Sequence, residues 1–352
     1  QVRPPEWYPQ NRVELRRDSR VAGVDVAGRA AVTASGERVA FDQLLLATGG
    51  RNRRLNVPGI ELEGVMQLRT QADCDRIRAA ARRGERIVML GMSFIGSEVA
   101  ASLTWLGAKV TNVFPEPAPL ALVLGPEIGE VLGRLHREKG VELIPGDSLE
   151  AFEGETRVEA VRTKSGRRLE CSAAILAVGI QPNVEFLEGS GIEVENGILV
   201  DELCRTSAPD VFACGDVANM EHPLFGRLRV EHFNNAEKHG RAAALSMLGR
   251  GRPYDYNFSF WSDQYEHKIE YVGMAKKWDE LAIRGSLEDA KLVGFYLAEG
   301  HLRAAVGLNR GGDPELEPDS ELAACSALIR SGKELTAAAL RDEGTDLWEL
   351  AR

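Results

Sequence analysis

The chain has 352 residues, of which 44% are hydrophobic and 27% charged, and its formal net charge is −10. This acidic balance argues against nucleic acid as a main partner, because a phosphate backbone repels a protein of the same sign. No apolar run approaches the ~18 residues of a membrane span, and residues 1–5 lack the features of a signal peptide, so we expect a cytoplasmic protein. The length allows two or three domains of about 100–200 residues each.

Short strands separated by turns are expected at the start of the chain, over residues 13–15, 21–24, 30–34, 39–41 and 44–47. The last of these strands is followed directly by Thr48-Gly49-Gly50. Glycines after a buried strand let the backbone approach a flat or phosphorylated ligand, and open α/β sheets bind their ligands at this end. The turn is therefore a candidate ligand-binding element.

A dinucleotide-binding βαβ pattern occupies residues 86–116. An apolar strand over 86–90 is followed by a glycine turn, a helix over 97–106 and a second strand over 109–114; the turn reads Gly91-Met92-Ser93-Phe94-Ile95-Gly96. Gly91 permits the tight turn, Gly96 lets the helix pack closely on the sheet, and the helix N-terminus attracts a pyrophosphate. Ser93 stands where the pattern usually has its middle glycine. We infer dinucleotide binding, with a plain βαβ packing unit as the alternative.

The elements around this pattern complete one nucleotide-binding domain over residues 69–182. A capping box formed by Thr70 and Asp73 opens a helix to about Arg83. A helix over 126–139, a strand over 141–144 and a hairpin of strands near 157–163 and 167–170 follow. A further buried strand begins at residue 173 and ends at Gly179, a candidate contact of the dinucleotide.

The rest of the chain combines a second ligand-binding strand end with a different architecture. A buried strand from Val211 ends in Gly215-Asp216, which places a carboxylate where it can accept hydrogen bonds from a sugar-alcohol chain. A helix is expected over 231–248. Antiparallel strands are expected near 267–274, 281–285, 291–298 and 301–308, followed by a capped helix over 319–329 and a polar tail. This last part reads as a separate α+β domain.

Five motifs in this order resemble those of FAD-dependent, pyridine-nucleotide-linked reductases. They are Leu45-Leu46-Ala47-Thr48-Gly49, Phe94-Ile95-Gly96-x-Glu98, Phe212-Ala213-Cys214-Gly215-Asp216-Val217-Ala218, Arg229-Val230-Glu231-His232 and Phe260-Trp261-Ser262-Asp263-Gln264. The most similar branch is the ferredoxin reductases of oxygenase systems. Monodehydroascorbate reductases and apoptosis-inducing-factor-like reductases are its near relatives.

The resemblance implies an α/β fold with two Rossmann-like nucleotide-binding domains and a C-terminal α+β domain. The FAD-binding domain would be discontinuous, over 1–68 and 183–253, with the NAD-binding domain (69–182) inserted and a reductase domain over 254–352. A family FAD domain begins with its own strand, G-x-G-x-x-G turn and helix, whereas residues 1–8 resemble a segment inside that domain. We therefore expect a truncated FAD domain, and weak FAD binding or none by this chain alone.

Site residues follow from the same resemblance. Asp216 would bind the flavin ribitol, with Gly215, Thr48 and Gly49 beside the FAD, and Glu98 would hold the nicotinamide carboxamide. Glu231 would lie where nicotinamide and flavin meet, and Trp261 would pack by the flavin ring. The alternatives are a solvated carboxylate for Glu98, a helix-start charge for Glu231 and interdomain core for Trp261. The NAD contacts would be Gly91, Ser93, Phe94, Ile95, Gly96, Glu116 and Gly179.

Glu116 bears on the choice between NADH and NADPH. An acidic residue after the second strand usually binds the adenosine ribose and disfavours a 2′-phosphate. Phe114 stands where many ferredoxin reductases carry Glu, but Glu116 lies in a Phe-Pro-Glu-Pro segment similar to that of monodehydroascorbate reductases. No arginine occurs between residues 111 and 133 to clamp a phosphate. NADH is therefore favoured, and a mere surface charge is the alternative for Glu116.

The implied reaction passes a hydride from NADH to FAD and electrons onward to ferredoxin or another small acceptor. The alternatives are reduction of a small radical or quinone, and a non-catalytic NAD-binding or interaction protein. A basic patch of Arg51, Arg53, Arg54 and Arg310 would suit an acidic ferredoxin, with a solvated loop as the alternative. The oligomeric state stays open between monomer and homodimer.

Cysteine and histidine usage predicts neither a redox disulfide nor a metal site. The histidines lack metal-ligand spacing, since His232 and His239 lie seven apart. The cysteines form no C-x-x-C pair, which is typical of reduced thiols in a cytosolic protein; they are Cys74, Cys171, Cys204, Cys214 and Cys325.

Overall fold

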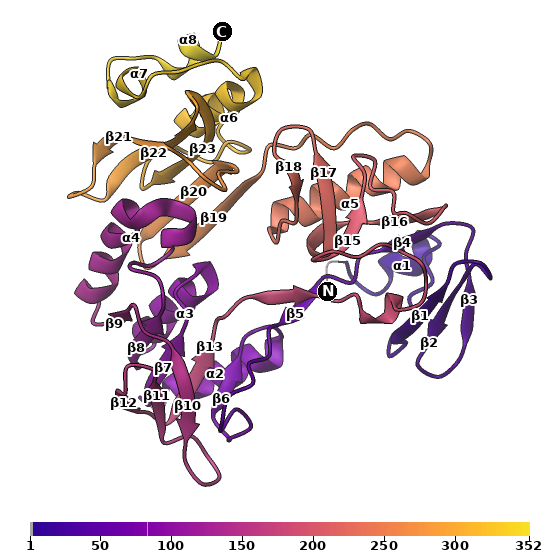
Figure 1. Cartoon of the computed structure of the whole chain (residues 1–352), viewed down its shortest axis with the longest axis horizontal. Coiled ribbons are helices and arrows are strands. Elements are labelled where there is room, and N and C mark those ends of the chain that lie inside the picture. Colours follow the sequence, from indigo (N-terminus) through magenta and orange to yellow (C-terminus); the bar gives the residue numbers. More distant parts are fainter. Residues whose placement is uncertain (1–2, 83) are drawn as a thin grey trace. The chain divides into compact units, whose positions relative to one another are not determined.

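The computed structural model describes residues 3–82 and 84–352. Gln1, Val2 and Arg83, the expected end of the helix opened by Thr70, lie outside this description. Contacts divide the chain into two compact units (Figure 1). Unit 1 contains residues up to 50, 182–231 and 236–255, and unit 2 contains 51–181, 232–235 and 256–352. The predicted division into three domains stays a prediction.

Unit 1 begins with small elements. A short helix α1 (Trp7–Gln10) precedes an antiparallel sheet of β1 (Val21–Asp25), β2 (Ala30–Thr33) and β3 (Arg38–Ala40). The strand predicted over 13–15 is wrong, and α1 was not predicted. The N–H of Val13 donates to Tyr8 O at 2.9 Å, so the end of α1 uses the backbone that a neighbouring strand would need.

Two parallel strands of unit 1 carry the glycine turns. Strand β4 (Leu44–Leu46) pairs with β16 (Val211–Ala213) in register Leu46 to Ala213. A second sheet contains β15 (Ile198–Val200), β17 (Ala218–His222) and β18 (Gly226–Leu228). Short 3-10 helices are η1 (Glu185–Leu187) and η2 (Gly215–Val217), and α5 (Phe233–Met247) begins two residues later than predicted.

The nucleotide-binding part of unit 2 is a parallel five-stranded sheet in the order β6-β13-β7-β8-β9. Its strands are β6 (Val65–Gln67), β7 (Arg86–Leu90), β8 (Lys109–Phe114), β9 (Glu142–Pro145) and β13 (Ala173–Leu176). All five strands run the same way, as the βαβ pattern requires. Strand β6 was not predicted, because three residues are too few to show a periodic hydrophobic pattern.

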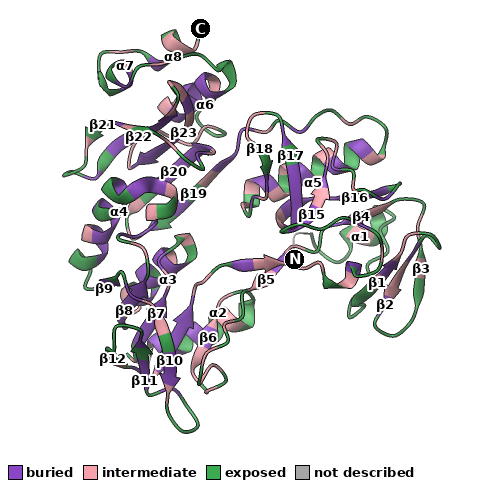
Figure 2. Cartoon of the chain, viewed as in Figure 1, coloured by how far each residue is buried: buried purple, intermediate pink, exposed green. Residues whose placement is uncertain are grey.

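Alternate residues of β7 enter different cores. Ile87 and Met89 pack with α2 (Gln71–Arg82) and α3 (Phe94–Trp105). Val88 and Leu90 pack with a small antiparallel sheet of β10 (Leu149–Glu153), β11 (Ala160–Thr163) and β12 (Arg168–Glu170). Cover on both faces explains why β13, and β7 after Arg86, are continuously apolar and buried, as Figure 2 shows for the centre of the sheet. β11 and β12 were predicted as a hairpin, whereas β10 was not predicted.

Helix boundaries follow local signals. The hydroxyl of Thr70 accepts from Asp73 N at 3.2 Å, and the Asp73 carboxylate accepts from Thr70 N at 2.9 Å, which confirms the capping box. Helix α4 (Ala121–Glu138) is kinked at Gly125, where φ is 79° and ψ 163°. Pro126 follows the kink, at the predicted start of this helix, because proline lacks an N–H and suits the first turn.

The C-terminal part of unit 2 is an antiparallel sheet in the order β19-β20-β23-β22-β21. Its strands are β19 (Ser259–Gln264), β20 (His267–Gly273), β21 (Glu280–Ser286), β22 (Lys291–Ala298) and β23 (His301–Leu308). Ser320 caps α6 (Glu321–Ser331) by accepting from Ala323 N. The predicted polar tail is wrong, because Thr336 caps α7 (Ala337–Arg341) and Asp346 caps α8 (Leu347–Ala351).

One hydrophobic core joins α4 to the C-terminal sheet. Leu124 and Ile128 of α4 are at most 1% exposed and pack in the same cluster as Tyr271 and Tyr296. The hydroxyl of Tyr296 donates to Leu124 O at 3.0 Å, next to the kink of α4. The shared core and this hydrogen bond thereby hold α4, the helix that follows β8, against the C-terminal sheet.

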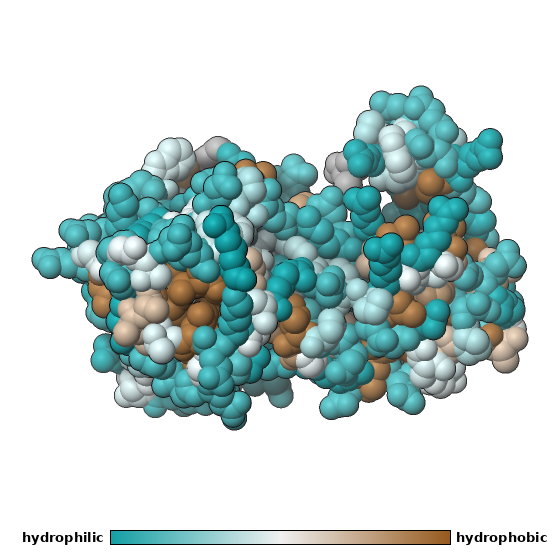
Figure 3. Space-filling model, turned by 90° about the horizontal axis from the view of Figure 1, so that it is seen from above, coloured by the Kyte–Doolittle hydropathy of each residue, from teal (hydrophilic) through white to brown (hydrophobic). Residues whose placement is uncertain are grey.

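Hydrophilic residues cover most of the face seen in Figure 3, with smaller hydrophobic groups between them. Within residues 3–82 and 84–352, no helix combines the length and the apolar character needed to cross a bilayer.

Candidate functional site

Two glycines shape the turn between β7 and α3. Gly91 has a φ of 100°, and a Cβ added there would lie 2.4 Å from Ala177 O. A Cβ added at Gly96 would lie 2.3 Å from Gly91 O. Side chains are therefore excluded at both positions, and the tight turn and close helix packing expected from the sequence are present.

Ser93 is the N-cap residue of α3. Its carbonyl accepts from Ser97 N at 2.8 Å, but its exposed side chain makes no capping hydrogen bond. The first-turn N–H groups of α3, which include those of Phe94 and Ile95, face the same end of the helix. A helix start of this kind offers donors and a partial positive charge to an anion.

A cavity of about 790 Å³ opens at the carboxyl ends of β7, β8 and β13. Its volume lies in the range of small-molecule sites. The predicted NAD contacts Gly91, Ser93, Phe94, Glu116 and Gly179 all line it. Gly96 packs beneath the turn instead, and Ile95 is exposed on α3.

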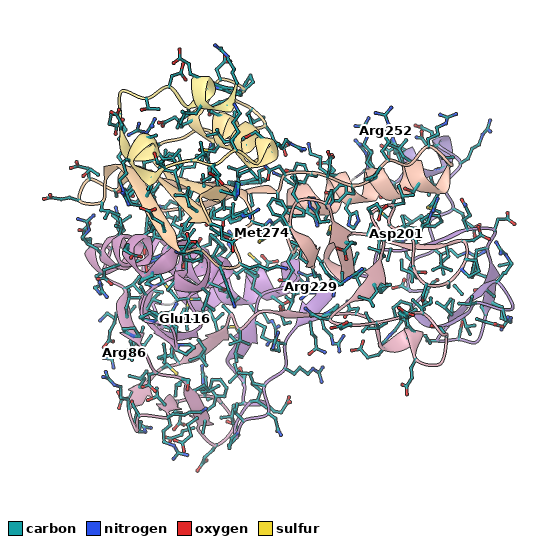
Figure 4. The ribbon with its side chains drawn as sticks, turned by 45° about the horizontal axis from the view of Figure 1, so that its top comes forward. Arg86, Glu116, Asp201, Arg229, Arg252 and Met274 are labelled. Atoms are coloured by element: carbon teal, nitrogen blue, oxygen red, sulfur yellow. The ribbon has the colours of Figure 1, made fainter. Side chains whose placement is uncertain are left out.

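Three charged side chains line this cavity: Glu116, Glu150 and Lys164. Glu150 forms an ion pair with Arg162 at 2.9 Å. Glu116 follows β8 and is half-buried (Figure 4). Lys164 lies in the turn between the two strands predicted near 157–163 and 167–170, and no local sequence signal places it in this cavity.

Main-chain hydrogen bonds bring Lys164 to the end of β8. Gly146 N donates to Glu116 O at 3.2 Å, Asp147 N to Phe114 O at 3.2 Å, and Lys164 N to Ser148 O at 2.8 Å. The buried carboxylate of Asp147 fastens this arrangement, accepting from Ser165 Oγ at 2.5 Å. Burial opposes its ionisation, but hydroxyl and N–H donors outweigh that penalty and lower the pKa of Asp147 to about 2.

Glu98 lies on α3 and is half-buried. The hydroxyl of Ser262, on β19, donates to Glu98 Oε1 at 2.7 Å. Burial raises the pKa of Glu98, Ser262 counteracts this, and the nearby charge of Asp263 raises it further. The half-buried carboxylate bound by Ser262 does not fit the alternative of a solvated helix carboxylate, and the role of Glu98 in binding the nicotinamide stays a prediction.

The predicted flavin contacts lie at one edge of unit 1. Because β4 and β16 run in parallel, Thr48-Gly49 and Gly215-Asp216 follow their strands at the same end. Gly49 and Gly215 have φ values of 58° and 71°, which favour glycine. Thr48 Oγ1 donates to Asn183 O at 2.9 Å, which fixes the first turn. The edge thus offers two open backbone turns and one partly exposed carboxylate, that of Asp216.

Arg229, labelled in Figure 4, contacts two of the predicted site residues of unit 1. Its Nη1 donates to Asp216 O at 3.1 Å and forms an ion pair with Glu231 at 2.7 Å. Sequence reasoning missed Arg229 as a site residue, although it belongs to one of the five motifs. Glu231 is exposed and lies two residues before α5, so the ion pair, rather than the helix alone, holds it.

Trp261 lies on β19 and is 45% exposed. Its ring meets that of Phe233 edge-on, with 6.5 Å between the ring centroids. Phe233 is 74% exposed. Two large aromatic side chains with this much accessible surface are available for a ligand or partner.

The expected basic patch loses one member. Arg310 forms ion pairs with Glu321 and Glu343, both at 2.7 Å, which raise its pKa. It therefore ties the C-terminal helices to β23, and its place in a docking patch was wrong. Arg53 and Arg54 are exposed.

Metal and thiol chemistry have little support in the described part of the chain. No group of three histidine, cysteine or acidic side chains gathers there in a metal-binding arrangement. The five cysteines are free. Burial raises the pKa of Cys171 and Cys214 to about 11, so both are protonated at neutral pH. The absence of a metal stays a prediction.

We expect the free energy of unfolding to fall as the pH is lowered from 6.5 to 4. Burial lowers the pKa of His136 and His239 to about 4, so the unfolded chain, with histidine pKa near 6.5, binds protons first. Their stabilisation is complete above 6.5 and is lost toward 4, by up to about 3 kcal/mol each. Urea denaturation at pH 7 and 4.5 measures it. If the free energy of unfolding changed equally with pH in the unmodified chain and in H239Q, the buried histidine would not be the origin of the effect.

Two family models match the chain: pyridine nucleotide-disulphide oxidoreductase over residues 8–240 and reductase C-terminal over residues 259–351. The chain is 34% identical to the 5,5'-dehydrodivanillate O-demethylase ferredoxin reductase subunit of Sphingobium sp., over 99% of this chain and 84% of that protein. It is also similar to two solved structures. One is the ferredoxin reductase for the CYP199A2 system from Rhodopseudomonas palustris (32% identity, TM-score 0.92, 99% and 85% of the two chains). The other is putidaredoxin reductase in covalent complex with putidaredoxin (30% identity, TM-score 0.92, 99% and 84%).

Proposed function

The chain belongs to the pyridine nucleotide-disulphide oxidoreductase family, and on that basis we propose that it is an NADH-dependent, FAD-containing reductase of a ferredoxin-type acceptor. The observation that carries the proposal is the cavity at the glycine turn, which is lined by a carboxylate after β8 and by the start of α3. The named relatives that are ferredoxin reductases support this acceptor over a small radical or quinone.

The residues of each unit suit one nucleotide. At the edge of unit 1, Gly49 and Gly215 leave the backbone open, and Asp216 supplies an acceptor for the ribitol hydroxyls of FAD. In unit 2, the first turn of α3 receives the pyrophosphate of NADH, and Glu116 accepts from the adenosine ribose. When bound, FAD accepts a hydride and releases electrons singly. The chain's residues hold the reactants in place rather than donate protons.

Further roles rest on the resemblance and on local geometry. Glu98 accepts from the nicotinamide carboxamide, Glu231 lies near the nicotinamide, and Trp261 packs by the flavin ring. Arg229 fixes Glu231 relative to the strand end that carries Asp216. The protein works in the cytoplasm, where five free cysteines stay reduced, and it acts as a monomer or a homodimer.

The visible spectrum of the purified chain with FAD tests this function. Because the sequence predicts weak FAD binding by this chain alone, FAD is supplied in excess. We then expect a flavin band that bleaches when NADH is added without oxygen and returns when an oxidised ferredoxin-type protein is added. D216A should weaken FAD binding at least tenfold, since a hydrogen bond to a charged group contributes about 1.5–3 kcal/mol. D42A, an exposed carboxylate of the same unit, is the control. NADH binding without any flavin reduction would instead favour a non-catalytic NAD-binding protein.

Glu116 and Lys164 should determine the tolerance for a 2′-phosphate. We expect E116Q to raise the affinity for 2′-phospho-ADP-ribose about tenfold, because a carboxylate that repels the phosphate is replaced while the Lys164 ammonium remains. K164M in the E116Q background should remove that gain. Calorimetry with ADP-ribose as the second ligand separates this effect from a general loss of binding. If E116Q still discriminated fully between ADP-ribose and 2′-phospho-ADP-ribose, residues other than Glu116 would determine the specificity.

A further inference from the structure

A continuous chain of hydrogen bonds leads from Glu98 into the interior of unit 2. Ser262 Oγ donates to Glu98 Oε1 at 2.7 Å, and Gln264 Nε2 lies 3.3 Å from Ser262 Oγ. Gln264 Oε1 lies 3.0 Å from His136 Nε2, and His136 Nδ1 lies 2.9 Å from the hydroxyl of Tyr265. Helices α3 and α4 and the β19–β20 hairpin each contribute to this chain.

The three central members are almost inaccessible to water. Ser262, Gln264 and His136 are 1%, 2% and 1% exposed. A buried polar group without a partner costs about 1–3 kcal/mol, so three such groups on the apolar seam between α4 and the C-terminal sheet are expensive unless they satisfy one another. In this chain each of the three has a hydrogen-bonding neighbour, so the buried polar groups form one connected network that ends at Glu98.

An ionised Glu98 fixes the direction of every hydrogen bond in the chain. A carboxylate can only accept, so the single hydroxyl proton of Ser262 points at Glu98. Gln264 must then donate its N–H to Ser262 Oγ and present its oxygen to His136. His136 donates from Nε2 to that oxygen, and its bare Nδ1 accepts from Tyr265. All four donors point toward Glu98.

The amide of Gln264 shows that this arrangement orients rather than conducts. A neutral amide does not readily accept and release a proton, so the chain is interrupted for proton transfer. It does hold Glu98 Oε1 in one place, which leaves Oε2 free to accept from another donor. A row of aligned dipoles in a poorly solvated interior also favours the carboxylate form of Glu98.

We propose that His136 and Gln264 are positioning residues, which act through Ser262 to hold the Glu98 carboxylate in the orientation that receives the nicotinamide carboxamide. The inference rests on the proposed role of Glu98 and extends it to residues that never touch the dinucleotide. His136 must be neutral to act in this way. Burial lowers its pKa to about 4, with Gln264 opposing this and His267 contributing to it, so the required form is present at neutral pH.

Calorimetry with two ligands tests the proposal without turnover. NAD⁺ contains the nicotinamide, and ADP-ribose is the same molecule without it. We expect S262A, Q264L and H136L to weaken NAD⁺ binding about five- to twentyfold and to change ADP-ribose binding less than twofold. H136Q, whose amide can still donate toward Gln264, should recover most of the loss. S259A is the matched control, since Ser259 is a buried serine of the same strand that contacts Tyr256 and Asn234 instead of Glu98.

Histidine nitrogen NMR of the wild-type chain provides a second readout that a merely structural role would not move. We expect the Nε2–H tautomer for His136 between pH 6 and 8, and loss of this fixed tautomer in S262A and Q264L. An Nδ1–H tautomer in the wild-type chain, or equal losses for NAD⁺ and ADP-ribose in a folded Q264L, would overturn the proposal. E98Q separates it from the proposed function. If E98Q binds NAD⁺ unchanged, the role of Glu98 itself fails; if E98Q is impaired and Q264L is not, only the positioning role fails.

Discussion

Replacing Gly96 by alanine is expected to lower the affinity for NAD⁺ at least tenfold and to destabilise unit 2 by about 1–3 kcal/mol. The added Cβ would lie 2.3 Å from Gly91 O. That atom belongs to the backbone of the glycine turn, so it cannot move aside as the end of a long side chain would. Relief requires α3 to withdraw from β7, which displaces the helix start proposed to bind the pyrophosphate. Calorimetry with NAD⁺ and urea denaturation measure the two effects.

Gly133→Ala is the matched control, because Gly133 also lies inside a helix, α4. A Cβ added there would come no closer than 3.4 Å to its neighbours, and alanine is the better helix former by about 0.5–1 kcal/mol. We therefore expect G133A to leave NAD⁺ binding unchanged and to keep or raise stability. Similar losses in G96A and G133A would mean that the close approach of α3 to the turn does not matter.

Replacing Arg284 by methionine is expected to destabilise the C-terminal part of unit 2 by about 3–5 kcal/mol. Arg284 on β21 is 3% exposed. Its guanidinium donates to Leu340 O at 2.8 Å and Thr345 O at 3.2 Å, and lies 3.7 Å from Glu321. Methionine fills similar space but leaves buried carbonyls of α7 and the following turn without donors. Denaturant unfolding gives the loss, and limited proteolysis should cut first between residues 337 and 351.

Arg341→Met provides the comparison. Arg341 pairs with Glu280 at 3.1 Å, and the two side chains are about half exposed. Exposed ion pairs contribute about 0–1 kcal/mol, so R341M should unfold almost like the unmodified chain. An R284M variant as stable as R341M would show that α7 and α8 are held by their apolar contacts alone.

The local part of the fold was predictable from the sequence. The run over 86–90, the glycine turn and the strand over 109–114 have the spacing of one βαβ unit, and the structure places them accordingly. The capping box at Thr70 was also correct, because all of its donors and acceptors lie within four residues. Signals of this kind need no knowledge of distant segments.

What the sequence could not provide depends on pairing between distant segments. Strand β19 (259–264) carries polar residues that the sequence pattern did not indicate as buried. Ser262 and Gln264 can be buried because side chains from α3 and α4 form hydrogen bonds with them. The segment that contains α7 and α8 looked like a polar tail because an arginine 55 or more residues earlier in the chain binds carbonyls of α7 and of the turn before α8. Lys164 reaches the cavity only through main-chain bonds with the segment after β9.

The kinked helix α4 has a consequence for how reductases of this family can exchange parts. Leu120, just before the helix, both lines the cavity at the glycine turn and belongs to the core shared with the C-terminal sheet. Consider a recombinant that takes its nucleotide-binding segment from one parent and its C-terminal sheet from another. Its core between α4 and the sheet would combine side chains from two parents, and the misfit would also reach the cavity on the other side of α4. The two segments should therefore be inherited together, although residues 182–231 and 236–255 of unit 1 lie between them in the sequence. Crossovers that respect this linkage would fall at the borders of unit 1, near residues 50, 182 and 255.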